Sequence, residues 1–345
     1  MEKKYSFTYT KTNSIIYSNC KDNNWEAAQS TPKDKLPINL LSGALQYGVQ
    51  CFEGIKAFRG VDGKVRIFRP DENAKRMKRS ADFLGMPCPP EELFVSMVKQ
   101  AVEENLDFLP SYESGASMYI RPTLLNTAQE IGLRPTEEAM FFVMVMPVGA
   151  YTVGGLKPVK AVLSRQYDRA APNGSGSYKL GGNYSPAFKV SRQASKEGYQ
   201  AVLFPDSREK KYIDEFSSSN FFAIKGNTFI TPKSPSVLPS ITNKSLQDLA
   251  IDYEMNIEKR PILVTELATF DEAGECGTAV VITPVYQIDD KMEVSSPKDD
   301  PNTKIYTFTN SSAEQCGPKS QKLYNGLTDI QYGRAEDPRN WCIVL

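Results

Sequence analysis

The stretch "GSYKLGGNYSPAF", residues 176–188, places one lysine, Lys179, between two glycine-rich segments with a tyrosine on either side. Glycine permits backbone conformations that other residues avoid, and it lets a chain approach a ligand closely. A phosphate-binding P-loop needs the order GxxxxGK followed by Ser or Thr, whereas Lys179 follows Tyr178 and precedes Leu180. Taken alone, the stretch indicates either a surface loop with a solvated lysine or a lysine held against a bound group.

The composition is that of an ordinary globular chain that lacks one catalytic residue type. Its 345 residues are 40% hydrophobic, and 41 basic side chains balance 41 acidic ones, so no net charge attracts nucleic acid or an anionic membrane. The chain contains no histidine. Hydrolases that depend on a catalytic histidine and metal centres with histidine ligands are therefore excluded. Acid and base chemistry near neutral pH must use Lys, Glu, Asp, Tyr or Cys side chains with shifted pKa values.

Cysteine spacing and the apolar segments indicate the compartment. The six cysteines are spread over the whole chain without CxxC spacing, which argues against a disulfide framework or a zinc site. Residues 1–7 lack the apolar core of a signal peptide. No run approaches the roughly 20 apolar residues of a membrane-spanning helix. We therefore expect a cytoplasmic protein with no bound metal, no nucleic-acid partner and no membrane association.

Strand and helix patterns alternate in both halves of the chain. Residues 63–70 predict a strand that leads into a helix over 71–84, with Asp71 capping its first turn and Gly85 just past its end. Further helices are expected over 91–106, 184–196 and 245–255, and a tight hairpin over 224–229. The glycine- and proline-rich segment that follows the first half has the composition of an interdomain connection. The predicted organisation is a small domain over 1–147, a linker over 148–158 and a large domain over 159–345 that carries Lys179.

Blocks of sequence on both sides of Lys179 resemble the branched-chain amino acid aminotransferases, which are pyridoxal phosphate (PLP) enzymes of fold type IV. The blocks are "QYGVQCFEGIKAFRG" (46–60), "FRPDENAKRMKRSADFL" (68–84), "YIRPTL" (119–124), "PVGAY" (147–151), "YKLGGNY" (178–184), "DEFSSSNFF" (214–222), "VLPSIT" (237–242) and "GTA" (277–279). One block alone is weak evidence, but together they follow the family's order from about residue 40 to 333. The resemblance implies a two-domain α+β and α/β fold, with a small α+β domain and a larger pseudo-barrel domain.

The resemblance implies transfer of an amino group between L-leucine, L-isoleucine or L-valine and 2-oxoglutarate, as in branched-chain amino acid biosynthesis. Lys179 would hold PLP as a Schiff base and, once displaced by the substrate amine, would carry a proton between the substrate Cα and the cofactor C4′. Lysine amines act in this way where positive charge and desolvation lower an amine's pKa. A chain without histidine can therefore run this reaction.

The resemblance also implies which residues bind the cofactor. Glu215 would pair with the pyridine nitrogen and keep it protonated, so that the ring accepts electrons. The phosphate would be bound by cationic and backbone donors, including amides just before a helix. Tyr184 would lie near the ring hydroxyl. The implied set is Arg69, Arg169, Lys179, Tyr184, Glu215, Ile241, Thr242 and Thr278.

A second implied set surrounds the substrate: Tyr47, Phe52, Tyr119, Arg121, Tyr151, Ser218 and Ala279. Aromatic walls with few polar points suit a branched aliphatic side chain. An arginine within the strand-like run of residues 117–125 must emerge at an edge or meet a carboxylate, so Arg121 is expected to bind the second carboxylate of glutamate or 2-oxoglutarate. The stretch "EFSSSN" replaces the family's more usual Gly-Thr-Met stretch, which bears on the contacts of Ser218.

Three other interpretations stay open. A D-amino acid aminotransferase and an aminodeoxychorismate lyase share the fold, but the segments "YIRP" and "FEGIKAF" favour the branched-chain enzyme. A non-catalytic phosphate-binding or structural protein would need neither a Schiff-base lysine nor a carboxylate for a ring nitrogen. The fold also implies a homodimer in which residues of the partner's small domain reach the pocket.

Overall fold

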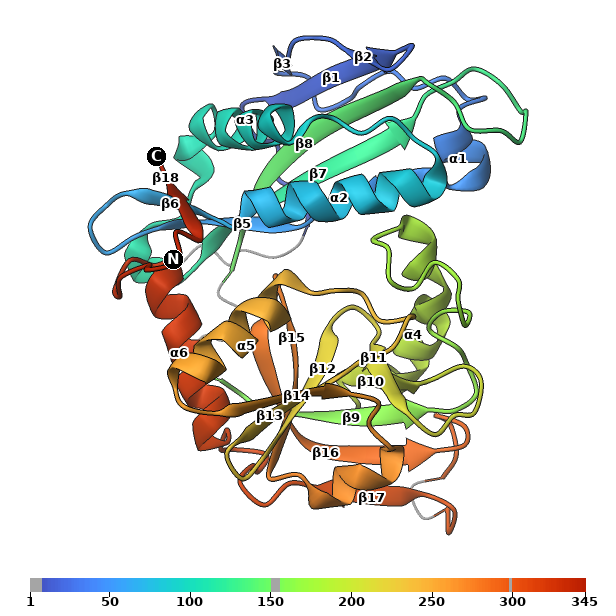
Figure 1. Cartoon of the computed structure of the whole chain (residues 1–345), viewed down its shortest axis with the longest axis vertical. Helices are drawn as coiled ribbons and strands as arrows, with labels where there is room; N and C mark the ends of the chain where they lie inside the picture. Colours follow the sequence, from blue (N-terminus) through green and yellow to red (C-terminus); the bar gives the residue numbers. More distant parts are fainter. Residues whose placement is uncertain (1–7, 150–155, 298–299) are drawn as a thin grey trace. The chain divides into compact units, whose positions relative to one another are not determined.

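The computed structural model describes residues 8–149, 156–297 and 300–345, and Figure 1 shows its helices and strands. The chain forms two compact units. Unit 1 comprises the described part of Met1–Val153 together with Tyr178–Gly181 and Asp329–Leu345, and unit 2 comprises Gly154–Ser177 and Gly182–Thr328. The domain boundaries predicted from the sequence placed Lys179 and the C-terminal residues in the second domain, whereas the division into compact units groups both with unit 1. The linker predicted over 148–158 falls largely outside the described residues.

Unit 1 is built on a nine-stranded sheet with the order β18-β6-β5-β7-β8-β1-β2, in which β3 pairs with β1 and β4 with β7. Every pairing in it is antiparallel. The strands are β1 (Ile15–Lys21), β2 (Asn24–Trp25), β3 (Gln29–Thr31), β4 (Gln50–Phe52), β5 (Ile55–Arg59), β6 (Val65–Phe68), β7 (Ser117–Asn126), β8 (Ala139–Val148) and β18 (Cys342–Val344). The long central strands β7 and β8 are mostly buried, as their apolar sequences predict.

Two helices of unit 1, α2 (Pro70–Leu84) and α3 (Glu91–Glu103), pack on each other and on this sheet (Figure 1). The predicted cap of α2 is wrong, because the helix begins one residue earlier and its N-cap is Arg69, with φ 49° and ψ 47°. Pro70 suits the first helical position, where its missing N–H costs nothing. Gly85 ends the helix with φ 65°, as predicted. The shorter elements are α1 (Gly43–Tyr47) and the 3₁₀ turns η1 (Leu106–Phe108) and η2 (Tyr112–Ser114).

Unit 2 contains a mixed nine-stranded sheet with the order β11-β10-β9-β16-β15-β12-β13-β14, and β17 pairs with β16. Because β11 also pairs with β12, six strands form a closed ring, which is the larger pseudo-barrel that the resemblance implies. The pairing that closes the ring joins Glu215 to Asn220. The strands are β9 (Val159–Ser164), β10 (Ala201–Pro205), β11 (Ile213–Phe216), β12 (Asn220–Lys225), β13 (Thr228–Pro232), β14 (Asn256–Arg260), β15 (Glu272–Gly277), β16 (Val281–Lys291) and β17 (Lys304–Thr307).

The remaining helices are α4 (Phe188–Lys196), α5 (Ile241–Asp252), α6 (Pro318–Gln331) and the 3₁₀ turns η3 (Gly181–Asn183), η4 (Ser185–Ala187) and η5 (Val264–Thr269). Helix α5 begins four residues earlier than predicted, after the N-cap Ser240, whose side chain accepts a hydrogen bond from Asn243 N at 3.1 Å. The hairpin predicted over 224–229 is present between β12 and β13, with Gly226 at φ 51°. Within the described ranges, no helix is both long and apolar enough to cross a membrane.

Candidate active site

The Lys179 segment packs against unit 1. Phe52 N donates to Lys179 O at 3.2 Å, and Leu180 forms an isolated β-bridge with Cys51. Leu180 is part of the buried apolar core of unit 1. The amine Nζ of Lys179 lies 4.9 Å from the centroid of the Phe52 ring. The backbone on both sides of the lysine is therefore anchored to unit 1.

Helix α2 supplies a second anchor that sequence reasoning missed. Lys179 N donates to the Oγ of Ser80 at 3.0 Å, and Ser80, fully buried, donates in turn to Arg76 O at 3.1 Å. One turn along the same helix face, the Phe83 ring stacks on Tyr178 with centroids 4.0 Å apart. Ser80 lies inside one of the blocks that carry the resemblance, but a helical serine gives no sign of its partner 99 residues away.

Arg121 lies between two aromatic rings of unit 1. Its Cζ is 4.7 Å from the Phe52 ring and 5.2 Å from the Tyr119 ring, and its Nη2 donates to the Tyr119 hydroxyl at 3.0 Å. Its Nε is buried without a hydrogen-bond partner among the described residues. A Cβ at Gly54 would collide with the Tyr119 hydroxyl, so a larger residue there would displace the Tyr119 side chain. Unit 1 thus brings Phe52, Tyr119, Arg121 and Lys179 together.

A buried ion pair fixes the turn that follows Phe52. Glu53 is fully buried, and its carboxylate accepts hydrogen bonds from Arg76 Nε at 2.8 Å, from Arg76 Nη2 at 2.6 Å and from Asn73 Nδ2 at 2.7 Å. Removing one partner from such a pair leaves an uncompensated charge, which costs about 3–5 kcal/mol. Helix α2 is therefore fastened both to the Phe52 turn and to the Lys179 segment.

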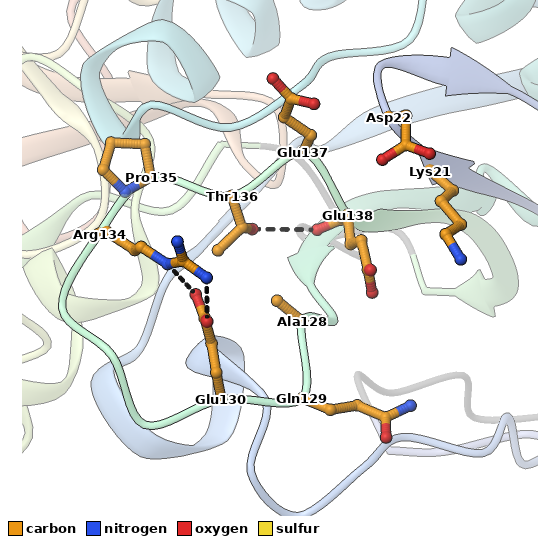
Figure 2. Close-up of a pocket in the computed structure, with 10 residues that line it drawn as sticks. All are labelled: Lys21, Asp22, Ala128, Gln129, Glu130, Arg134, Pro135, Thr136, Glu137 and Glu138. Atoms are coloured by element: carbon orange, nitrogen blue, oxygen red, sulfur yellow. Dashed lines mark hydrogen bonds and ion pairs between the residues drawn. The ribbon is translucent and has the colours of Figure 1, made fainter.

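Tyr47, a predicted substrate residue, hydrogen-bonds to a surface loop. It ends α1, is 46% exposed, and donates its hydroxyl to Ile131 O at 2.9 Å. Ile131 belongs to the loop between β7 and β8, which lines a surface pocket of about 620 Å³ together with the end of β1 (Figure 2). The pocket's charged side chains include the pair Arg134 and Glu130, with Nη2 and Oε2 2.6 Å apart. The pocket contains none of the predicted site residues.

Glu215 lies in β11 of unit 2 and is 1% exposed, which rules out a solvated surface carboxylate. Its Oε1 lies 2.9 Å from Arg169 Nη1 and accepts from Leu238 N at 3.2 Å, and its Oε2 accepts from Asn220 Nδ2 at 2.9 Å. Arg169 is buried as well, and its Cζ lies 5.9 Å from the Tyr184 ring. Unit 2 thus brings Arg169, Tyr184 and Glu215 together.

Burial raises the pKa of Glu215 to about 7, although the nearby Arg169 guanidinium and the hydrogen bond from Leu238 N act in the opposite direction. A buried carboxyl with this pKa is ready to give up its proton when a cationic group comes close. The protonated nitrogen of a pyridine ring is such a group. In addition, Arg169 Nε is buried without a hydrogen-bond partner in the described part of the chain.

The residues predicted to bind phosphate in unit 2 lie at element ends. Ile241 and Thr242 are the first two residues of α5, rather than preceding it as predicted, so their N–H groups are among the helix donors that have no intrahelical acceptor. Thr278 and Ala279 lie in the turn between β15 and β16. Ser218 is exposed in the bend that joins β11 to β12. A Cβ at Gly277 would lie 3.7 Å from Ser219 Cβ, so this bend and that turn are neighbours.

Arg69, the predicted phosphate arginine of unit 1, is buried at the start of α2. Tyr151, the remaining predicted substrate residue, lies outside the described residues. Each unit carries groups that suit one part of PLP. Unit 1 has a lysine amine on an anchored backbone segment and a buried arginine, and unit 2 has a buried carboxyl and the first-turn amides of a helix. Asn220, which binds Glu215, is a further residue that sequence reasoning missed, although it lies within the block "DEFSSSNFF".

The fold is that of the branched-chain aminotransferases. The crystal structure of the Escherichia coli branched-chain amino acid aminotransferase superposes with a TM-score of 0.78 at 24% sequence identity, over 96% of this chain and 99% of that one. A T.th. branched-chain amino acid aminotransferase with pyridoxamine 5′-phosphate also gives 0.78, at 25% identity over 97% of this chain and 99% of that one. The expected fold type IV aminotransferase architecture is therefore confirmed.

Sequence relatives extend the likeness over almost the full chain. Residues 50–288 match the amino-transferase class IV family. A branched-chain-amino-acid aminotransferase of Haemophilus influenzae is 41% identical over 346 residues, which cover 98% of this chain and 97% of that one. One of Helicobacter pylori is 38% identical over 342 residues, covering 98% and 96%. The chain belongs to the amino-transferase class IV family, whose members are PLP-dependent transaminases.

Proposed function

We propose that the protein transfers the amino group between L-leucine, L-isoleucine or L-valine and 2-oxoglutarate with PLP as cofactor. The observation that carries the proposal is the position of Arg121 between the Phe52 and Tyr119 rings, on the unit that also holds the Lys179 amine. An apolar wall beside a partly unsatisfied guanidinium suits substrates that are apolar in one half-reaction and carry a second carboxylate in the other. The names of the Haemophilus influenzae and Helicobacter pylori relatives support the same substrate class.

When bound, PLP supplies an aldehyde that condenses with amines and a ring that accepts electrons from the substrate Cα. In the proposal, the Nζ of Lys179 is the covalent attachment point. As a free amine, Nζ would accept the proton of the substrate Cα and return it later in the reaction. The hydrogen bonds of the Lys179 backbone to Ser80 and Phe52 keep the released side chain at its site during this transfer.

Glu215 keeps the ring nitrogen protonated in the proposal. Arg169 and Asn220 hold its carboxylate from two directions, so that a lone pair faces one position only. The phosphate is bound by Arg69, by the first-turn amides of Ile241 and Thr242 and by the Thr278 hydroxyl. Tyr184 contacts the ring hydroxyl.

The substrate is enclosed by aromatic and small side chains in the proposal. Phe52 and Tyr119 form the apolar wall, and Arg121 binds the second carboxylate of glutamate or 2-oxoglutarate. Tyr47, Tyr151, Ser218 and Ala279 complete the proposed substrate set. We also propose that the enzyme is a homodimer, as the family resemblance implies, and that it acts in the cytoplasm.

Arg121→Leu should separate the two half-reactions. Without the guanidinium, kcat/KM for glutamate is expected to fall about 10- to 100-fold, because a hydrogen-bonded ion pair of about 1.5–3 kcal/mol is lost. The value for leucine should change about twofold, since its side chain carries no charge. Arg134→Leu, in the exposed loop of Figure 2, is the control and should leave both values unchanged. An equal loss for both donors would show that Arg121 does not bind the second carboxylate.

An amino-donor panel tests the proposed function against its alternatives. The holoenzyme is assayed with 2-oxoglutarate and L-leucine, L-isoleucine, L-valine or D-alanine, and separately with 4-amino-4-deoxychorismate. We expect turnover with the three L-amino acids only. Turnover of D-alanine would instead identify a D-amino acid aminotransferase, and pyruvate release from 4-amino-4-deoxychorismate would identify the lyase of the same fold. A protein that binds PLP but turns over none of them would be a binding protein.

A further inference from the structure

The C-terminal strand meets the start of helix α2. Strand β18 pairs antiparallel with β6, with Cys342 opposite Phe68, and Figure 1 shows the two strands side by side. One position further on, Arg69 N donates to Trp341 O at 2.7 Å. The tail itself is held by Asp337, whose Oδ2 accepts from Cys342 N at 2.7 Å. The last residues of the chain therefore extend the sheet of unit 1 as far as Arg69.

The Trp341 side chain packs on the Arg69 guanidinium. Arg69 Cζ lies 5.0 Å from the centroid of the indole ring, and each residue is only 6% exposed. The edge of the indole is fixed in turn by the Phe68 ring, whose centroid is 5.9 Å away at an interplanar angle of 82°. An aromatic ring at this distance attracts the cation, most strongly where both are shielded from water. The indole therefore restrains the position of the Arg69 guanidinium.

The backbone of Arg69 needs support from outside the helix. Its φ of 49° and ψ of 47° lie in the left-handed region, which is unfavourable for a residue with a Cβ. Arg69 has no side-chain capping bond, and the next residue is a proline that fixes the helix start. The hydrogen bond to Trp341 O and the indole contact both act on this one residue. The direction in which its side chain leaves the helix start therefore depends on the C-terminal segment.

We propose that Trp341 is a positioning residue for phosphate recognition, acting through Arg69, and that the C-terminal segment thereby contributes to cofactor affinity. The inference rests on the proposed function, in which Arg69 binds the phosphate of PLP. Trp341 does not donate to the phosphate in this proposal. It fixes the guanidinium, so its effect is confined to ligands that carry the phosphate.

The test compares two ligands that differ only in the phosphate. PLP and pyridoxal are titrated into the full-length cofactor-free protein, and binding is followed by absorbance. Trp341→Leu is expected to raise the dissociation constant of PLP about tenfold, the size of one buried cation–π contact, and that of pyridoxal less than about twofold. Trp341→Phe, which keeps an aromatic face, should show an increase of only about threefold for PLP. Arg69→Ala should have a larger effect than Trp341→Leu, and combining the two should add nothing further.

Ile343→Ala is the matched control, because Ile343 lies two residues after Trp341, in β18, and packs against the core of unit 1. It is expected to lower the melting temperature without changing the ratio of the PLP and pyridoxal dissociation constants. If Trp341→Leu changes both constants equally, or neither, while Arg69→Ala still weakens PLP selectively, the inference is wrong and the proposed function stands. If Arg69→Ala leaves the ratio unchanged, the proposed phosphate role of Arg69 itself is wrong. Should Trp341→Leu fail to fold, the same ratio measured for Trp341→Phe decides.

Discussion

Lys179→Ala is expected to show no imine absorption band after incubation with PLP and removal of the unbound cofactor, and to lose transaminase activity by at least about 10⁴-fold, since both the covalent attachment point and the proton carrier are removed. The wild-type protein should keep the imine band after the same treatment. Spectra of the two desalted proteins and a coupled assay with L-leucine measure the two effects. A wild-type protein without an imine band after this treatment would remove the cofactor from the proposal.

A second buried lysine, Lys56, is a competing candidate for the attachment of PLP. Lys56 in β5 is 7% exposed, and burial lowers its pKa to about 8, which makes it a rival nucleophile. Reduction of the holoenzyme with borohydride converts the imine to a stable amine, so the modified lysine can be located by peptide mass spectrometry. We expect the pyridoxyl group on Lys179. A label on Lys56 would move the attachment point to β5.

Glu215→Gln is expected to keep the cofactor and lose about 100-fold in kcat, equivalent to about 2.7 kcal/mol of transition-state stabilisation. Glutamine can accept a hydrogen bond at the same place, but it carries no charge to hold a proton on the ring nitrogen. Glu275→Gln is the control, since Glu275 is also a buried carboxyl whose pKa is raised by burial, in the nearby strand β15. The control should leave kcat unchanged, and an unchanged kcat in Glu215→Gln would remove Glu215 from its proposed role.

The same substitution has a signature in the stability of the cofactor-free protein. Because burial raises the pKa of Glu215 from 4.5 to about 7, the folded state binds more protons than the unfolded state between these pH values. The free energy of unfolding therefore falls as the pH rises through this window, by about 3 kcal/mol from this one carboxyl. Glu215→Gln should remove that part of the slope. Urea unfolding of both cofactor-free proteins at pH 4.5 and 7.5 measures it, and parallel slopes would contradict the raised pKa.

The sequence was sufficient to predict the family and its fold, because the resemblance rests on short contiguous motifs. The Lys179 and Glu215 blocks are contiguous, and the resemblance placed them without knowledge of their partners. The partners could not be predicted, because Ser80 and Lys179, or Arg169 and Glu215, are joined only by the tertiary fold. Side chains such as Ser80 look like ordinary helix residues until the strand or loop that they bind is placed beside them.

Element ends were the least predictable part of the fold. Asp71 is a good N-cap by residue type, yet Pro70 at the first helical position places the N-cap at Arg69 instead. Helix α5 begins earlier than its apolar pattern because Ser240 supplies a cap that the periodicity does not register. In both helices a residue just before the apolar pattern sets the start.

The closure of the ring in unit 2 has an evolutionary consequence. Strands β11 and β12 pair through Glu215 and Asn220. Asn220 also donates to the carboxylate of Glu215, which we propose binds the ring nitrogen. Losing this junction would turn two interior strands into edges, and exposed edges recruit other chains and aggregate. The backbone pairing that keeps the ring closed therefore also fixes the position from which the Glu215 carboxylate projects. Substitutions that change substrate preference are expected in the bend of residues 217–219 and the turn of residues 278–280. Side chains there can change without breaking the strand pairing that closes the ring.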